Sequence, residues 1–321
     1  MKELADAHGS IRKDTAAVGD GQSCTAGFGP AMNSPRSVTF AGAEGNRLVG
    51  DRYESSRSGA PLVILLHGGG QTRHAWRSTA RRLADSGLAT AIAFDQRGHG
   101  DSEWPESGAY EFEDFARDLT VVADAVVAGS GRRPALIGAS LGGIAAIIAE
   151  GNASRSVFSS LVLVDVTPRM EPSGVARILQ FMGEHLEEGF ATIEDAADAV
   201  AGYLPNRPRP RSLDGLRRNL RHGADGRWRW HWDPRFLGPQ RQDAETMARL
   251  SNAARRLALP TLLVRGGQSE LVREDHAREF LALVPGARYA DVSGAGHMVA
   301  GDRNDAFSDA VIAFLGETIV A

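Results

Sequence analysis

A serine between two glycines, placed directly after an apolar run, constrains the fold of this chain more than any other feature. Residues 134–137 (Pro-Ala-Leu-Ile) lead into 138–142 (Gly-Ala-Ser-Leu-Gly), and residues 144–150 have the composition of a helix. This order predicts a strand, a tight turn with Ser140 at its apex, and a helix, which together lift a serine hydroxyl clear of a sheet. The two flanking glycines are expected where helix and strands approach too closely for a side chain.

Apolar runs and helical stretches alternate along the rest of the chain. Continuous apolar runs typical of strands buried on both faces occur at residues 62–66, 89–94, 161–164 and 261–264. Helical spacing occurs at residues 72–86, 112–128, 277–284 and 305–315. We therefore predict an α/β fold with a doubly wound, mostly parallel sheet. Ligands of such sheets bind at the carboxyl ends of the strands, where Ser140 lies.

The alternation is interrupted between residues 167 and 258. Amphipathic stretches at 175–182 and 193–200 predict a largely helical cap, inserted between two late core strands. The predicted organisation is an N-terminal extension (1–36), a first part of the core (37–166), the cap (167–258) and a second part of the core (259–321). The extension is rich in Gly, Ala and Ser, so we expect it to be flexible or to pack on a neighbouring surface or subunit. A homodimer is therefore among the options.

Composition excludes several classes of function. The 321 residues are 24% charged and 42% hydrophobic, which describes a soluble globular protein. A formal net charge of −4 provides no basic field for nucleic acid or a membrane. The single cysteine, Cys24, fits a reducing, cytoplasmic compartment. No metal-ligand spacing and no dinucleotide-binding glycine pattern occurs, so we expect neither a metal nor a cofactor.

A nucleophilic serine needs a general base and an acid that orients the base. The best base is His297, in a glycine-rich loop between a short strand at 288–292 and the last helix. The best acid is Glu270, just past the strand that begins at residue 261. Asp165, at the end of its own strand, is the main alternative, and Asp275 ranks behind both.

An oxyanion hole also needs two backbone N–H donors. Leu141, which follows the nucleophile, is expected to provide one, and Gly69, in the turn His-Gly-Gly-Gly at 67–70, the other.

Four residues are candidates for substrate binding. His74 and Trp76 follow the oxyanion turn, although Trp76 could equally belong to the core. Phe181 and Trp230 lie in the predicted cap. The segment 228–233 (Trp-Arg-Trp-His-Trp-Asp) alternates aromatic and polar residues and predicts a short strand. Its tryptophans would form either an aromatic wall or the small core of the cap.

Taken together, these motifs resemble the α/β-hydrolase superfamily, in the large group whose members carry a cap. The matching segments are 67–70, 94–102 (Phe-Asp-Gln-Arg-Gly-His-Gly-Asp-Ser), 138–142, 163–165 (Leu-Val-Asp) and 296–297 (Gly-His). The resemblance covers residues 37–321, and its chain order of nucleophile, acid and histidine fits. It departs at Glu270, where relatives often carry aspartate.

The motifs and the resemblance imply a cofactor-independent serine hydrolase. Its substrate would be a small, hydrophobic carboxylic ester or lactone, cleaved through an acyl-enzyme on Ser140. Two alternatives stay open. The same residues could hydrolyse a C–C bond of a diketone, or the protein could be a small-molecule receptor with slow turnover.

Overall fold

The computed structural model describes residues 34–204, 212–238, 243–297 and 304–319. The chain divides into two compact units, Met1–Ser34 and Pro35–Ala321. The described residues belong almost entirely to the second unit. The predicted extension therefore lies outside the described residues, except for residues 34–36.

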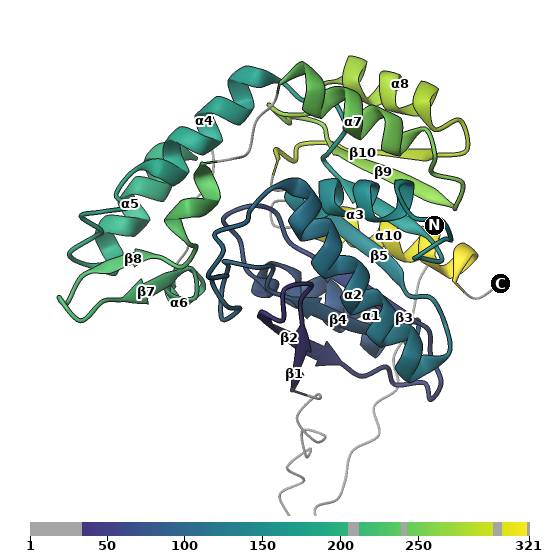
Figure 1. Cartoon of the computed structure of the whole chain (residues 1–321), viewed down its shortest axis with the longest axis horizontal. Helices are drawn as coiled ribbons and strands as arrows, with labels where there is room; N and C mark the ends of the chain where they lie inside the picture. The colour runs from purple at the N-terminus through teal and green to yellow at the C-terminus, as the bar shows by residue number, and fades with distance from the viewer. Residues whose placement is uncertain (1–33, 205–211, 239–242, 298–303, 320–321) are drawn as a thin grey trace, which may run out of the picture. The chain divides into compact units, whose positions relative to one another are not determined.

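In the described part of the chain, eight strands form one sheet and two form a separate hairpin (Figure 1). The sheet strands are β1 (Arg36–Ala41), β2 (Arg47–Tyr53), β3 (Leu62–Leu66), β4 (Thr90–Phe94), β5 (Ala135–Ala139), β6 (Leu161–Val164), β9 (Thr261–Gly266) and β10 (Arg288–Val292). Their spatial order is β1-β2-β4-β3-β5-β6-β9-β10. Strand β2 runs antiparallel to both of its neighbours, β1 and β4, and the strands from β4 to β10 are parallel. The mostly parallel, doubly wound sheet is confirmed.

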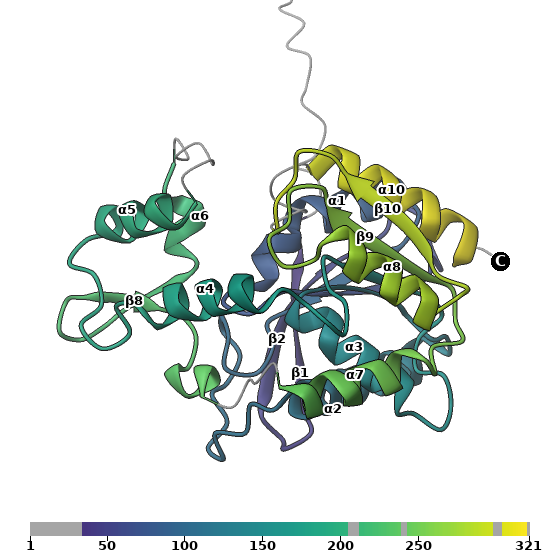
Figure 2. The same ribbon diagram turned by 90° about the horizontal axis from the view of Figure 1, so that it is seen from above.

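Helices cover both faces of the sheet (Figure 2). They are η1 (Arg73–Trp76), α1 (Arg77–Asp85), α2 (Phe112–Ser130), α3 (Leu141–Gly151), α7 (Ala244–Ala254), α8 (Glu274–Leu283) and α10 (Asn304–Thr318). One hydrophobic cluster joins the sheet to α2, α3, α7 and α8, and another joins its opposite face to α1 and α10. The stretch predicted as one helix at 72–86 is a 3-10 turn, η1, followed by α1. None of the helices within the described ranges is long and apolar enough to cross a membrane.

The segment between β6 and β9 carries the remaining elements. They are α4 (Pro172–Gly183), α5 (Ile193–Tyr203), α6 (Asp214–Arg217), η2 (Pro234–Leu237) and the antiparallel hairpin of β7 (Leu220–His222) and β8 (Trp228–Trp230). These elements lie beyond the carboxyl ends of the parallel strands (Figure 1). The last helix of the segment, α7, packs instead on α3, so closely that a Cβ on Gly151 would strike the backbone of Ala253.

Candidate active site

Ser140 occupies the strained turn between β5 and α3. Its φ is 45° and its ψ is −114°, which is a backbone conformation that non-glycine residues rarely adopt. A Cβ on Gly138 would lie 2.6 Å from the carbonyl oxygen of Gly142, and one on Gly142 would lie 2.5 Å from that of Leu66. Both glycines are therefore required by close backbone approach, as the sequence predicted.

His297 contacts a buried carboxylate. Its Nδ1 lies 2.6 Å from Oδ2 of Asp165, which follows β6 and is fully buried. The same carboxylate accepts hydrogen bonds from the Gly266 N–H at 3.0 Å and from the Ser269 hydroxyl at 2.5 Å. Because three donors surround this carboxylate, its charge is compensated and its orientation is fixed. An ionised carboxylate only accepts, so His297 carries its proton on Nδ1 and leaves Nε2 as the basic nitrogen.

Glu270, the acid expected from the sequence, does not make this contact. Its Oε2 lies 2.6 Å from Nη1 of Arg177, on helix α4, and both side chains are more than two-fifths exposed. Asp275 is also exposed, and it pairs with Arg273 and Arg169. The structure thus corrects the expected contact from Glu270 to Asp165. The adjacent ends of β6 and β9 carry both acids, but only Asp165 is directed inward toward the histidine loop.

The glycine turn after β3 supplies backbone N–H groups beside Ser140. The Gly68 N–H donates to Gln71 Oε1, and the Gly70 N–H donates to His99 Nε2. The Gln71 N–H donates to the Gly68 carbonyl. Within the described residues, no hydrogen bond uses the N–H of Gly69. Leu141 is the first residue of α3, where an N–H has no intrahelical acceptor. Among the described residues, the N–H groups of Gly69 and Leu141 therefore have no hydrogen-bond acceptor.

Three buried histidines hold this turn and the neighbouring loop. Each donates from one ring nitrogen to a carbonyl and accepts an N–H at the other. His67 donates to the Gly68 carbonyl and accepts the Gln96 N–H. His99 donates to the Arg97 carbonyl and accepts the Gly70 N–H. His231 donates to the Gly70 carbonyl and accepts the Gly100 N–H. Burial lowers the pKa of His67 to about 4 and that of His99 to about 3, and it places the pKa of His231 well below its ordinary value. All three rings are therefore neutral at pH 7.

A cavity of about 860 Å³ lies over Ser140 and His297. Its walls are mainly apolar and come largely from the segment between β6 and β9. Phe181 and Trp230, expected to bind substrate, both line it, as does Trp232. The indole rings of Trp230 and Trp232 stack with centroids 5.0 Å apart and planes at 10°. The cavity is within the size range of small-molecule sites.

The other two residues expected to bind substrate lie elsewhere. Trp76 is 1% exposed and packs against Phe307 on the opposite face of the sheet. His74 does not line the cavity either, and its Nδ1 lies 3.8 Å from Asp51. The structure therefore places neither residue at the cavity, because both lie in η1, which follows the glycine turn.

Comparisons with known proteins give the family. Residues 63–310 match the model of the alpha/beta hydrolase family. The chain belongs to this family. It is 31% identical over 262 residues to an esterase of Mycobacterium tuberculosis, across 78% of this chain and 82% of that protein. It is also 30% identical over 253 residues to a 2-(acetamidomethylene)succinate hydrolase of Mesorhizobium japonicum, across 76% and 84%.

A solved structure agrees with this assignment. The crystal structure of an alpha/beta hydrolase from Novosphingobium aromaticivorans matches with a TM-score of 0.71 at 25% identity, covering 90% of this chain and all of that one. The resemblance noted from the motifs is confirmed.

In this alpha/beta hydrolase, sequence reasoning missed three residues at the site. Ser269 bonds the buried carboxylate of Asp165, Arg177 pairs with Glu270 on the cavity wall, and His231 reaches the glycine turn. The alternating pattern around His231 was a usable signal, since it places this side chain opposite the two tryptophans that flank it. Nothing in the local sequence marks Ser269 or Arg177, because their partners lie about 100 residues away along the chain.

Proposed function

We propose that this chain is a serine hydrolase that cleaves a hydrophobic carboxylic ester or lactone. The observation that carries the proposal is the 2.6 Å contact between His297 Nδ1 and the buried Asp165, in the same cavity as Ser140. A serine, a histidine and an aspartate that bonds the histidine are the three groups that activate a hydroxyl for acyl transfer. The similarity to an esterase over most of both chains supports an ester as the substrate.

In the proposed reaction, Nε2 of His297 takes the proton of the Ser140 hydroxyl as the oxygen attacks the carbonyl carbon. Asp165 stabilises the imidazolium that forms and keeps the ring in its working tautomer. The N–H groups of Gly69 and Leu141 bind the oxyanion of the tetrahedral intermediate, and each is worth about 3 kcal/mol in the transition state. The imidazolium then protonates the leaving alcohol, and the acyl group remains on Ser140.

The second half of the reaction uses the same groups. Nε2 of His297 takes a proton from water, whose oxygen attacks the acyl carbonyl. Collapse of the second intermediate returns the proton to Ser140 and releases the acid. One ester and one water give one acid and one alcohol, and Ser140 and His297 return to their starting protonation states. The proposed cycle therefore needs no cofactor.

The cavity supports a hydrophobic substrate. Apolar side chains form most of its wall, including Phe181, Trp230, Trp232 and Phe236. Burying apolar surface contributes about 25 cal/mol per Å². A large acyl or alcohol group should therefore bind more tightly than acetate or methanol.

The Ser140→Ala variant tests the proposal against a series of aryl esters. We expect the variant to stay folded and to lose esterase turnover by at least about 1,000-fold. Ester hydrolysis at the wild-type rate by the variant would exclude Ser140 as the nucleophile. A wild-type protein that cleaves a diketone but none of the esters would replace the ester proposal with C–C bond hydrolysis.

A further inference from the structure

His231 links the inserted segment to the glycine turn beside Ser140. It follows β8, and only 1% of its surface is exposed. Its Nδ1 accepts the N–H of Gly100 at 2.7 Å, and its Nε2 lies 3.2 Å from the carbonyl oxygen of Gly70. A backbone N–H can only donate, so Nδ1 must be the unprotonated nitrogen. The proton therefore lies on Nε2 and is donated to Gly70.

Gly70 is held on both sides. Its N–H donates to Nε2 of His99 at 3.2 Å, and its carbonyl accepts from His231. Its φ of +71° belongs to the left-handed region, where glycine is the residue that fits without strain. The turn is closed by the bond from the Gln71 N–H to the Gly68 carbonyl, and the bonds of His99 and His231 tie Gly70 to the loop after β4 and to the inserted segment. Gly69, the proposed oxyanion donor, directly precedes this clamped residue.

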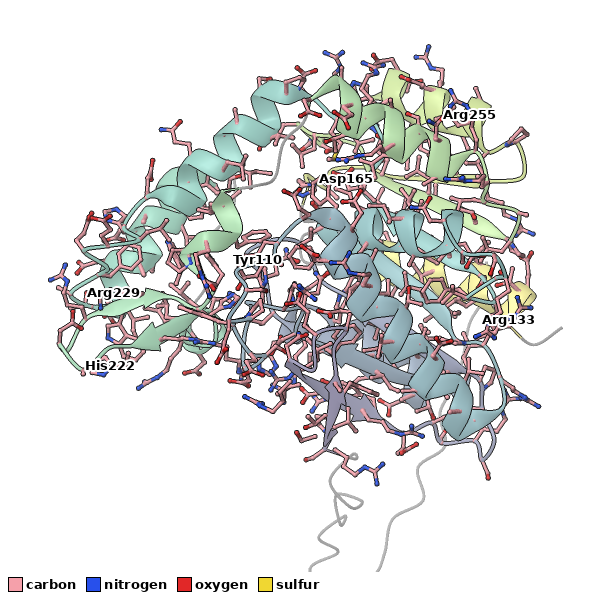
Figure 3. All side chains as sticks on the ribbon, in the orientation of Figure 1. Tyr110, Arg133, Asp165, His222, Arg229 and Arg255 are labelled. Carbon is pink, nitrogen blue, oxygen red and sulfur yellow. The ribbon has the colours of Figure 1, made fainter. Side chains whose placement is uncertain are left out.

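The position of His231 is fixed by the residues that follow it. The N–H of Asp233 donates to the carbonyl of Gly98 at 2.9 Å, and the Tyr110 hydroxyl donates to Asp233 Oδ2 at 2.6 Å. Tyr110 lies between the inserted segment and the sheet (Figure 3). These bonds anchor the stretch around His231 to the loop after β4. The bond from His231 to Gly70 is therefore part of a hydrogen-bonded contact between the inserted segment and the core.

The same stretch also forms the cavity wall. Trp230 and Trp232 line the cavity, whereas His231, between them, bonds the glycine turn. Side chains alternate in this way along an extended segment. One short stretch thus contacts both the space for the substrate and the loop that carries an oxyanion donor.

We propose that His231 is a positioning residue for the proposed hydrolysis. It holds the Gly70 peptide so that the N–H of Gly69 meets the developing oxyanion. This inference rests on the proposed function of the site. It predicts an effect on the transition state more than on substrate binding, because His231 reaches the substrate only through the turn.

Two substitutions separate the two hydrogen bonds of His231. The amide of Gln can replace the Nε2–H donor to Gly70, whereas the shorter Asn can replace only the Nδ1 acceptor of Gly100. His222→Asn is the matched control, because His222 lies on the hairpin that precedes His231, is exposed at its outer end and does not line the cavity (Figure 3). Each variant is assayed for kcat and KM on an aryl ester and for inhibition by an aryl trifluoromethyl ketone, which forms an oxyanion on a serine nucleophile.

We expect His231→Asn to lower kcat by about 10- to 100-fold, somewhat less than the loss of an oxyanion donor itself. Its KM should stay within about threefold, and its trifluoromethyl ketone inhibition constant should rise in proportion to the loss of kcat. His231→Gln should keep kcat within about fivefold of the wild type, and His222→Asn should match the wild type.

Equal losses of kcat in the Asn and Gln variants, or a change confined to KM, would overturn the positioning role. So would a folded His231→Asn variant with wild-type kcat. If that variant does not fold, His231→Gln alone decides, and a loss of kcat above about 100-fold contradicts the inference. Failure of the proposed function is recognised separately, by a wild-type protein without esterase activity or by an active Ser140→Ala variant.

Discussion

Replacing Asp165 by asparagine tests the hydrogen-bond geometry behind His297. The Gly266 N–H can only donate to this side chain, so the oxygen of the new amide must face Gly266. The amide nitrogen then faces His297 Nδ1 and the Ser269 hydroxyl, at the position of Oδ2. An NH₂ group there favours the tautomer with an unprotonated Nδ1 and a proton on Nε2. His297 in that tautomer cannot take the proton of Ser140.

The expected loss follows from this change of tautomer. If the proposed function holds, we expect kcat on an aryl ester to fall by about 10,000-fold, which is the loss that serine hydrolases show when the triad aspartate is replaced by asparagine. That loss corresponds to about 5 kcal/mol of transition-state stabilisation. KM should change little, because Asp165 does not line the cavity. Steady-state kinetics at pH 7 measure both constants, and circular dichroism checks that the variant is folded.

Glu270→Gln is the matched comparison, since Glu270 is the other acid at these strand ends. Its ion pair with Arg177 is more than two-fifths exposed on each side, and such pairs contribute about 0–1 kcal/mol. We expect kcat of this variant to stay within about fivefold of the wild type. A large loss in Glu270→Gln together with an active Asp165→Asn variant would refute the reasoning.

Three further outcomes follow from the same structure. Ser269→Ala removes one donor to the buried carboxylate, so we expect kcat to fall about tenfold and the free energy of unfolding to fall by about 1–2 kcal/mol, measured by kinetics and urea denaturation. Trp230→Leu shortens the cavity wall, so the ratio of kcat/KM for a hexanoate over an acetate aryl ester should fall about tenfold; an unchanged ratio would place the acyl chain elsewhere. Acid should also destabilise the protein, because the folded state keeps His67, His99 and His231 neutral while each takes up a proton in the unfolded chain below its ordinary pKa of 6.5. The contribution of these three histidines to the free energy of unfolding is complete above pH 6.5 and decreases toward pH 4. Between pH 6 and pH 5 the free energy of unfolding should fall by about 3 kcal/mol in total. Urea denaturation at these two pH values measures it, and equal stability at both would contradict the buried, neutral state of these rings.

The sheet and the serine turn could be predicted because their signals are local. Strands buried on both faces are continuous apolar runs, and the turn at Ser140 requires glycines at fixed offsets. The short strand, the glycine loop and the helix around His297 are likewise adjacent in the sequence. These features need no knowledge of which distant segments meet.

The carboxylate that contacts His297 could not be chosen without the tertiary structure. Asp165 and Glu270 follow neighbouring parallel strands, so chain order and strand ends allow either one. The choice depends on side-chain direction, which the Gly266 N–H and the Ser269 hydroxyl fix for Asp165. Arg177, from the inserted segment, pairs with Glu270 instead.

Two other residues show the same limit. Trp76 follows the glycine turn in sequence, but its apolar contacts are with Phe307 near the other end of the chain. His231 contacts Gly70, which is 161 residues earlier. The Trp76 contact leaves no mark in the local pattern, and the alternation around His231 indicates only the direction of its side chain. Packing of distant elements therefore decides both contacts.

The most direct test of the central claim is labelling with a fluorophosphonate, followed by mass spectrometry of the peptides. The account predicts a single adduct on Ser140, formed in parallel with the loss of ester hydrolysis, and no adduct on the Ser140→Ala variant. An adduct on a different residue, or full esterase activity after Ser140 has been labelled, would contradict it.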